Sequence, residues 1–422
     1  MDQGFQFYVG IDWATEAHQV CLMDRDGQTI KEISIEHTGT AIARFAEELR
    51  QLSGGHPEKV AVAIEMPRGA VVETLVEKGF AVFAINPKQL DRFRDRHTVA
   101  GAKDDRRDAF VAADSLRTDQ HCFRRVRLDD PLVIQIREMS RLDEDLCEEL
   151  NRQSNRLRDL LHRFYPQMLG LSPAADDPWL WSLLELAPTP AQGKRLRSQK
   201  IAALLRRHRI RRLSPSDVME KLKTPELTGA PGVTEACSAH IALLLPSLCL
   251  THAQRVKCQA QIEMLLDQLG EASPKEGEER REHRDVEILR SLPGVGRKVA
   301  ATMLAEASQP LVERDYHALR AHAGVAPVTR QSGKRATVSM RRACNQRLRN
   351  AVYHWARVSA QVDPQTKTQY GALRQRGHSH GRALRGVADR LMRILVAMLQ
   401  RGTLYEPSRL THATLVTAES HA

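Results

Sequence analysis

Short apolar runs and amphipathic segments alternate along the first 125 residues of the chain. Short apolar runs bounded by turn residues are typical of strands, whereas apolar residues three and four positions apart are typical of helices. This pattern predicts strands at Phe7–Asp12, Gln19–Met23, Thr29–Ile35, Val60–Ile64 and Phe80–Ile85, and helices at Thr40–Leu52, Ala70–Glu77 and from about Asp104. Three strands followed by alternating helices and strands predict an α/β domain over residues 1–125.

The middle of the chain has a helical period. Apolar residues recur at steps of three, four or seven over Leu132–Phe164, which predicts a long helix with a coiled-coil-like stripe. Thr251–Leu269 predicts a second amphipathic helix, and the polar segment Gly270–Glu279 predicts a linker. Residues 167–250 show no single period. We therefore expect residues 126–283 to form a long helical, coiled-coil-like region with an insertion at about 167–250.

Residues 284–407 are predicted to form a mostly α-helical domain. Apolar residues at helical spacing predict helices at Val299–Ala307, Asn345–Val362 and Gly381–Arg401. Residues 408–422 show no such pattern and are predicted to be a frayed tail.

Positive charge is concentrated in two parts of this 422-residue chain, whose formal net charge is +11. Residues 284–407 hold 22 Lys and Arg against 8 Asp and Glu. Lys194–Arg212, predicted to be a basic helix, holds nine cations and no acid. Clustered cations are the electrostatic footprint of nucleic-acid binding. Aromatic residues make up only 5%, so base stacking on aromatic platforms is not the expected mode of binding.

The rest of the composition is that of an ordinary soluble protein. No run approaches about 18 apolar residues, and the first residues do not form a secretory signal. We therefore expect no membrane span. The seven cysteines form no C-x-x-C pair and no zinc-binding spacing, which predicts reduced thiols in the cytoplasm.

Carboxylates follow two of the predicted strands. Asp12 ends the first strand and Glu65 follows the fourth, and functional groups collect at strand C-termini in α/β sheets. Asp105 and Asp108 lie three residues apart on one helix, so they point the same way. Together the four carboxylates could hold two Mg²⁺ ions about 4 Å apart for phosphoryl transfer. The alternative interpretation is that each acid is a surface residue or a helix cap.

Two motifs of the C-terminal domain indicate contacts with phosphate. Leu292–Gly296, followed by a helix, is typical of a helix–hairpin–helix turn, in which glycines and helix N-terminal N–H groups approach the backbone. Ser332 precedes Gly333 among cations that could neutralise a scissile phosphate, and its hydroxyl is a candidate nucleophile. The predicted nucleic-acid-binding residues are Gly294, Gly296, Arg297, Lys298, Arg330, Lys334, Arg335, Arg341, Arg342, Arg206, Arg207 and Arg209.

The chain carries F-Y-V-G-I-D-W-A, I-E-M-P, I-N-P, A-K-D-D-R-R-D-A, L-P-G-V-G and G-V-A-P with Q-S-G-K-R, in this order. In these motifs it resembles the IS110-family transposases over residues 5–120 and 284–400. The resemblance implies a RuvC-like domain of RNase H type. Its DEDD acids fall on Asp12, Glu65, Asp105 and Asp108, which would bind Mg²⁺. It also implies that Ser332 forms a covalent link to DNA.

The same resemblance implies an active site shared between the protomers of a homodimer or homotetramer. It further implies a structured guide RNA, called a bridge RNA, that pairs with target and donor DNA. Two features depart from the family pattern. Asp104 stands where a threonine or asparagine is usual, and the segment 167–250 is longer than the compact linker of the family. We predict that its basic helix binds the guide RNA.

The leading interpretation is thus an RNA-guided DNA transposase or recombinase of an insertion sequence, acting in the prokaryotic cytoplasm at the nucleoid. The first alternative is a RuvC-like nuclease or resolvase that uses the acids alone, or a DNA invertase of the same pattern. The second is a non-catalytic nucleic-acid-binding protein. An actin-like kinase, suggested by Gly10–Thr15, would need a second Gly-rich phosphate loop, which the sequence lacks.

Overall fold

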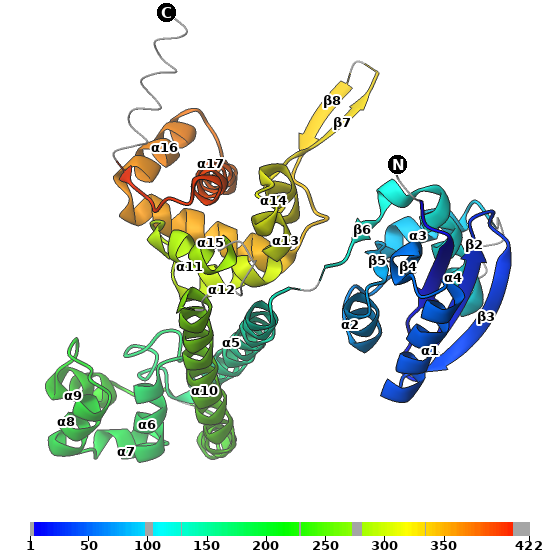
Figure 1. Cartoon of the computed structure of the whole chain (residues 1–422). Coiled ribbons are helices and arrows are strands. Elements are labelled where there is room, and N and C mark those ends of the chain that lie inside the picture. The colour runs from blue at the N-terminus through cyan, green and yellow to red at the C-terminus, as the bar shows by residue number, and fades with distance from the viewer. Residues whose placement is uncertain are drawn as a thin grey trace, which may run out of the picture. The chain divides into compact units, whose positions relative to one another are not determined.

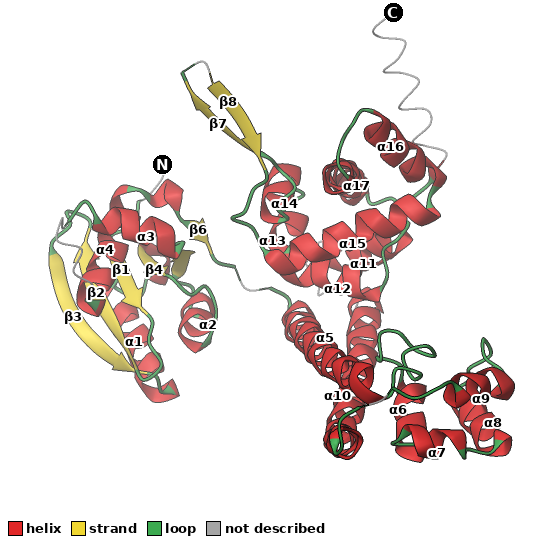
Figure 2. Ribbon diagram, turned by 180° about the vertical axis from the view of Figure 1, so that it is seen from behind, coloured by secondary structure: helices red, strands yellow, loops and turns green. Residues whose placement is uncertain are grey.

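The computed structural model of the protein describes residues 4–97, 104–127, 129–227, 229–271, 281–333 and 335–407. The chain divides into two compact units, Met1–Asp129 and Asp130–Ala422 (Figure 1). Figure 2 shows that the first unit combines strands with helices, whereas the second is almost entirely helical. The prediction of a mixed α/β domain followed by a helical region is confirmed. Lys334, the tail 408–422 and most of the predicted linker Gly270–Glu279 lie outside the described residues.

The first unit is built on one six-stranded sheet. Its strand order is β3-β2-β1-β4-β5-β6, in which β1, β4 and β5 are parallel neighbours and β2 and β6 run antiparallel to theirs. The five predicted strands are confirmed with small shifts at their ends, and β6 was not predicted. The strands are β1 (Phe7–Asp12), β2 (Ala17–Asp24), β3 (Thr29–Glu36), β4 (Val60–Ile64), β5 (Ala81–Ala84) and β6 (Arg124–Arg125).

Helices cover both faces of this sheet. The helices α1 (Gly39–Leu52) and α2 (Ala70–Glu77) bury their apolar stripes against residues such as Val9 and Val62 on one face. On the other face, α3 (Pro87–Arg94) and α4 (Asp105–Thr118) pack against Ala61, Ala63 and Phe83. Residues alternate between the two faces along a strand, so this layering decides which side each strand-end side chain occupies.

Two long antiparallel helices pack together in the second unit. They are α5 (Pro131–Phe164), as predicted, and α10 (Val233–Glu271). Arg255 of α10 bonds Asp143 of α5, and Ser247 bonds Gln153, which sets their antiparallel register. The helix predicted over Thr251–Leu269 is confirmed, but its predicted start is wrong, because α10 begins at Val233 and continues through Pro246. Apolar contacts on both sides of the proline stabilise the helix despite the lost N–H.

Helix α10 is long and apolar enough to cross a membrane by length and composition alone, with a mean hydropathy of 1.5 over 18 residues. The sequence analysis expected no membrane span because no continuous apolar run approaches about 18 residues, and that argument did not anticipate this helix. His240 and Pro246 interrupt the apolar run in the sequence and hide it from a search for continuous runs. Of the tested window, 28% is buried in the described structure, and one such helix is weak evidence for a membrane span. Helix α10 packs along α5 and against a small helical lobe.

The segment that connects α5 to α10 in the sequence forms this lobe. It consists of α6 (Pro178–Leu186), α7 (Pro190–Lys194), α8 (Ser198–Arg207) and α9 (Pro215–Lys223). Trp179 and Trp181 are buried at its centre. A single basic helix over Lys194–Arg212 was predicted, and this is wrong, because α7 ends at Lys194 and α8 at Arg207.

The remaining helices enclose a second core around the fully buried Trp355. An exposed β-hairpin projects from them (Figures 1 and 2). The three predicted helices are confirmed as α12, α15 and α17, and the hairpin was not predicted. The elements are α11 (Arg281–Ser291), α12 (Arg297–Glu306), α13 (Ser308–Val312), α14 (Tyr316–His322), β7 (Val328–Ser332), β8 (Arg335–Ser339), α15 (Gln346–Val362), α16 (Pro364–Gln375) and α17 (His380–Arg401).

Candidate active site and nucleic-acid surfaces

Asp12 and Glu65 follow neighbouring parallel strands at the same edge of the sheet. In the β1–β4 ladder, Ile11 pairs with Ile64, so Asp12 and Glu65 are the next residues along each strand. Val9 and Ile11 face α1 and α2, so alternation turns Asp12 to the α4 face. Glu65 shares that face by the same argument, since Ala61 and Ala63 pack against α4.

Helix α4 brings the other two acids to this edge. Ala109 and Ala113 of α4 share a small core with Cys21 and Met23 of β2, and a Cβ at Gly27, just after β2, would lie 3.0 Å from the guanidinium of Arg117. Since Asp24 of β2 pairs with Phe7, the C-terminal end of α4 lies near the start of β1, and α4 runs antiparallel to β1. Its first turn, which contains Asp105 and Asp108, therefore extends towards the Asp12 end of the strand. The structure thus places the four predicted acids at one corner of the sheet, on the side covered by α4.

The four carboxylates differ in their partners. Asp108 is 3% exposed and accepts a hydrogen bond of 2.7 Å from Nε of Arg94, the last residue of α3. Arg94 also bonds Asp91, and these carboxylates raise its pKa although burial opposes the shift. Within the described residues, the half-buried Glu65 and the exposed Asp105 make no hydrogen bond or ion pair. Sequence reasoning did not identify Arg94, because nothing in the sequence pairs it with Asp108.

The chemistry of the corner fits a hard divalent cation, because all four side chains offer carboxylate oxygens. Among the described residues, however, no three of these acids lie within 4.8 Å of one another. Carboxylates without a cation repel each other, which favours such spreading. Glu65 and Asp105 have no competing protein partner, so they are the two acids that are most available to a metal.

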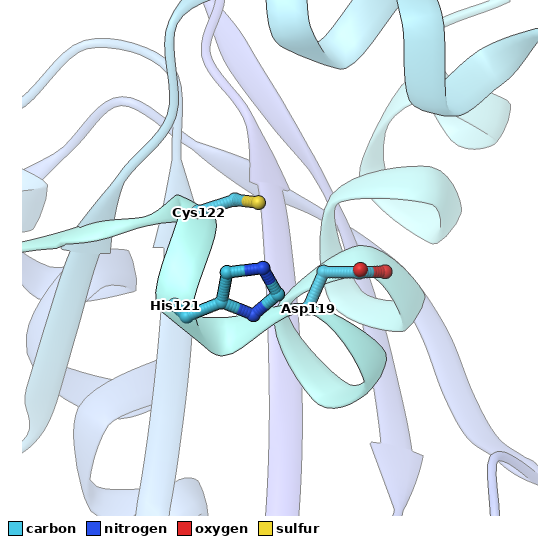
Figure 3. A group of neighbouring side chains, drawn as sticks. All are labelled: Asp119, His121 and Cys122. Carbon is cyan, nitrogen blue, oxygen red and sulfur yellow. The ribbon is translucent and has the colours of Figure 1, made fainter.

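One group in the described part of the chain does have metal-ligand spacing, namely Asp119, His121 and Cys122 (Figure 3). Asp119 already accepts hydrogen bonds from Arg96 at 2.7 Å and Thr118 at 2.8 Å. The bond from Arg96 is the main cause that lowers the pKa of Asp119. Because the guanidinium of Arg96 would repel a bound cation, this group is better explained as an ion pair than as a metal site.

A buried histidine fixes the turn that follows Asp12. His18 is 1% exposed, and its Nδ1 accepts a hydrogen bond from the backbone N–H of Ala14 at 3.3 Å. Its Nε2 lies 2.9 Å from Nδ1 of His37. Burial, and secondarily the neighbouring His37, lower the pKa of His18, so it is neutral at neutral pH. Sequence reasoning missed this residue, because a histidine within an apolar strand has no distinguishing spacing.

Ser332 is the last residue of β7 and lies at the tip of the hairpin. It pairs across the hairpin with Arg335, and nearly every side chain of both strands is exposed. Within the described residues, its hydroxyl makes no hydrogen bond, and Arg330 and Arg335 form no ion pair. The second unit therefore presents a serine hydroxyl between free guanidinium groups and supplies no base to it from the residues described.

The helix–hairpin–helix turn is more engaged than the sequence suggested. A Cβ at Gly294 would lie 2.7 Å from Oγ of Ser359, so this glycine permits close packing of α15. Arg297 interacts with Glu263 at 3.7 Å and Lys298 with Asp143 at 3.9 Å. Gly296, by contrast, has open space at its Cα. Of this predicted phosphate site, Gly296 is therefore open to a ligand, whereas Gly294, Arg297 and Lys298 already contact other residues.

The other predicted cations fall into two places. Arg341 is half-buried after β8, and Arg342 beside it is exposed. Arg206 and Arg207 end α8, and Arg209 follows them, all three exposed and without an ion pair among the described residues. The lobe and the hairpin are thus the two sites where predicted nucleic-acid-binding residues carry uncompensated charge.

Known transposase families and insertion-element proteins match this chain, two of the relatives over nearly its whole length. Residues 9–166 match an IS110-type DEDD domain described as Transposase, and residues 286–371 match one described as Transposase IS116/IS110/IS902 family. A protein of the IS117 mini-circle from Streptomyces coelicolor is 31% identical over 411 residues, which are 95% of this chain and 96% of its own length. The 43.6 kDa protein of insertion element IS110 from the same organism is 28% identical over 406 residues, 94% of this chain and 95% of its own. Protein y4uE of Sinorhizobium fredii is 52% identical over 206 residues, 49% of this chain and 57% of its own length.

Proposed function

Because the chain belongs to the IS110 family of transposases, we propose that it recombines insertion-sequence DNA through a covalent serine–DNA intermediate. Mg²⁺ at Asp12, Glu65, Asp105 and Asp108 assists the reaction. The observation that carries the proposal is the pair of complementary sites. One unit gathers four carboxylates at a sheet corner, and the other presents an unpartnered serine among cations.

The hydroxyl of Ser332 is the proposed nucleophile. Its oxygen forms a bond to a backbone phosphorus, the bridging P–O bond of the DNA strand breaks, and the leaving oxygen takes up a proton. Arg330 and Arg335 bind the phosphate and offset its charge. The phosphoserine link conserves the energy of the broken bond, so a second DNA end can attack it and restore the serine.

We propose that the four carboxylates at the corner of the sheet supply the metal-binding groups that the hairpin around Ser332 does not have among the described residues. Glu65 and Asp105 would hold the metal first, with Asp12 at the strand end beside Glu65. Bound Mg²⁺ would act as a Lewis acid on phosphate oxygens. Arg94 holds the carboxylate of Asp108 in place beside these acids.

We further propose that the enzyme acts as a homodimer or homotetramer in the bacterial cytoplasm at the nucleoid and takes a structured guide RNA. Two features support this. The acids and the serine belong to separate units, which suits a site assembled between protomers. The chain also carries basic surface on the lobe, in addition to that around Ser332.

The test uses the full chain with its copurifying RNA, Mg²⁺ and labelled element-junction DNA, quenched in denaturant. We expect a protein–DNA adduct in the wild type and none in Ser332→Ala. Ser339→Ala is the matched control, because Ser339 is an exposed serine of the same hairpin. Cleavage without an adduct, unchanged in Ser332→Ala, would establish a metal-only nuclease or resolvase instead.

A further inference from the structure

The lobe carries a group of cations that the fold leaves uncompensated. We name as the basic face the six exposed cations between residues 197 and 211, which make no ion pair or hydrogen bond with another side chain among the described residues. They are Arg197, Lys200, Arg206, Arg207, Arg209 and Arg211. Two nearby cations differ, since Lys194 pairs with Glu226 at 2.7 Å and Arg212 with Asp177 at 3.2 Å. The lobe therefore contains acids that form ion pairs with nearby cations, but among the described residues none of them pairs with the basic face.

The fold orients these cations outward. Ile201, Leu204 and Leu205 of α8 are buried in the core of the lobe, which leaves Lys200 and Arg207 on the opposite side of the helix. These two lie seven residues apart, about 10 Å along one face of a helix. The basic face is thus a row of positive charge that extends along an exposed side of α8 and into the turn that follows it.

The chain turns back beside the end of α8 in an uncommon conformation. Arg209 has a φ of 56°, in the left-handed region that is unfavourable for a non-glycine residue. The N–H of Ile210 bonds the carbonyl of Leu205, and the partly buried Ile210 packs on the core. This closure keeps Arg209 and Arg211 beside the end of α8.

The lobe offers charge but no exposed aromatic ring. Tyr165, Trp179 and Trp181, its large rings, are at most 2% exposed. Unpaired bases bind by stacking on exposed rings, so this surface suits the phosphates of a double helix. The narrow major groove of A-form RNA brings two rows of phosphates close together, which matches a row of cations.

The position of the lobe favours a bound cofactor over the DNA that is cut. The lobe packs on α10 around Cys237–Leu248, and the C-terminal core packs around Cys258–Leu269. The two places are roughly 30 Å apart along the helix. A surface so far from the core that carries the Ser332 hairpin can stay occupied while DNA strands are exchanged.

We infer that the basic face binds the backbone of a double-helical segment of RNA. The inference rests on the proposed function in one respect, namely that the enzyme uses a structured RNA. It adds which surface holds that RNA and which part of the RNA is held.

The test measures binding of the full chain to a 20-base-pair RNA duplex across a salt series. In Arg206→Gln/Arg207→Gln/Arg209→Gln/Arg211→Gln we expect affinity to fall at least about ten-fold at low salt. The slope of log affinity against log salt should flatten by up to about 3.6, roughly 0.9 for each of the four lost phosphate contacts. The matched control Arg44→Gln/Arg50→Gln/Lys59→Gln/Lys78→Gln removes the same charge from the first unit and should bind RNA like the wild type.

Unchanged RNA affinity in the lobe variant, or an equal loss in the control, overturns the inference. A larger loss for a DNA duplex of the same sequence than for RNA assigns the basic face to DNA and overturns the commitment to RNA. The serine adduct reports the proposed function separately. RNA binding that depends on the basic face in a protein that forms no adduct would keep this inference and reject the proposed function.

Discussion

Gly10 lies so close to Ala109 that a Cβ at Gly10 would be 1.9 Å from the carbonyl oxygen of Ala109. The same Cβ would be 2.6 Å from the backbone nitrogen of Ala113. Strand β1 and helix α4 therefore touch through their backbones. This contact places the first turn of α4, with Asp105 and Asp108, beside the end of β1, with Asp12.

Gly10→Ala should separate β1 from α4, because backbone atoms cannot move aside as a flexible side chain can. We expect a loss of at least about 2 kcal/mol in stability of the first unit, seen as faster hydrogen exchange of β1 and α4 amides by mass spectrometry. Gly39→Ala is the control, since nothing lies within 4 Å of a Cβ there. Wild-type exchange in Gly10→Ala would contradict the contact.

Arg94→Met should leave the carboxylate of Asp108 buried without its cation. Breaking a buried pair by removing one partner costs about 3–5 kcal/mol, and a denaturant titration of the first unit should show a loss of this order. The double variant Arg94→Met/Asp108→Asn should recover part of it, because the isolated charge is gone. Arg92→Met, an exposed residue of the same helix, should be nearly neutral. Equal effects of Arg92→Met and Arg94→Met would remove the special role of the pair.

Acid should weaken the turn after Asp12 through His18. Its pKa is lower in the folded protein than the ordinary value of about 6.5, so the unfolded chain binds the proton more readily. The stability that neutral His18 contributes is complete above about pH 6.5 and is lost as the pH falls towards the folded pKa. Thermal unfolding of the wild type between pH 7 and pH 5 should show this loss, and His18→Gln should show less of it. His56→Gln, at an exposed site, should keep the wild-type profile, and the same profile in His18→Gln would disprove the role.

Gly193→Ala should strain the lobe, because a Cβ at Gly193 would be 1.9 Å from the hydroxyl oxygen of Tyr165. Overpacking of this kind costs about 1–3 kcal/mol. That hydroxyl is buried without a hydrogen-bond partner, so Tyr165→Phe should cost little and should partly rescue Gly193→Ala. The fluorescence of Trp179 and Trp181 in the same core reports thermal unfolding of the lobe. A lack of rescue would show that the two positions are independent.

Local patterns allowed the first unit to be predicted well. Its strands are short apolar runs that end at acids or turns, and parallel strand ends meet at one edge, so the neighbourhood of Asp12 and Glu65 followed from the sequence. The side chains that contact the site residues could not be predicted from the sequence. Arg94 reaches Asp108, and His18 reaches Ala14 and His37, through tertiary packing that has no period in the sequence.

In the second unit, the local sequence pattern of several segments predicts a different structure from the one they adopt. Pro246 suggested a break, yet packing on α5 and the lobe keeps α10 continuous. The basic segment suggested one helix, yet Ile210 packs on the lobe core and ends it. The hairpin of β7 and β8 has exposed side chains on both faces, so it lacks the apolar alternation that reveals a strand.

The exposure of this hairpin has a thermodynamic consequence. An isolated two-stranded hairpin is at best marginally stable in water, and only Val328 at its base is partly covered. In the reaction proposed above, the conformational entropy lost when Ser332 becomes fixed would be offset when the hairpin binds DNA. Part of the binding free energy would then go into ordering the serine, which would become well positioned only where a phosphate backbone holds it.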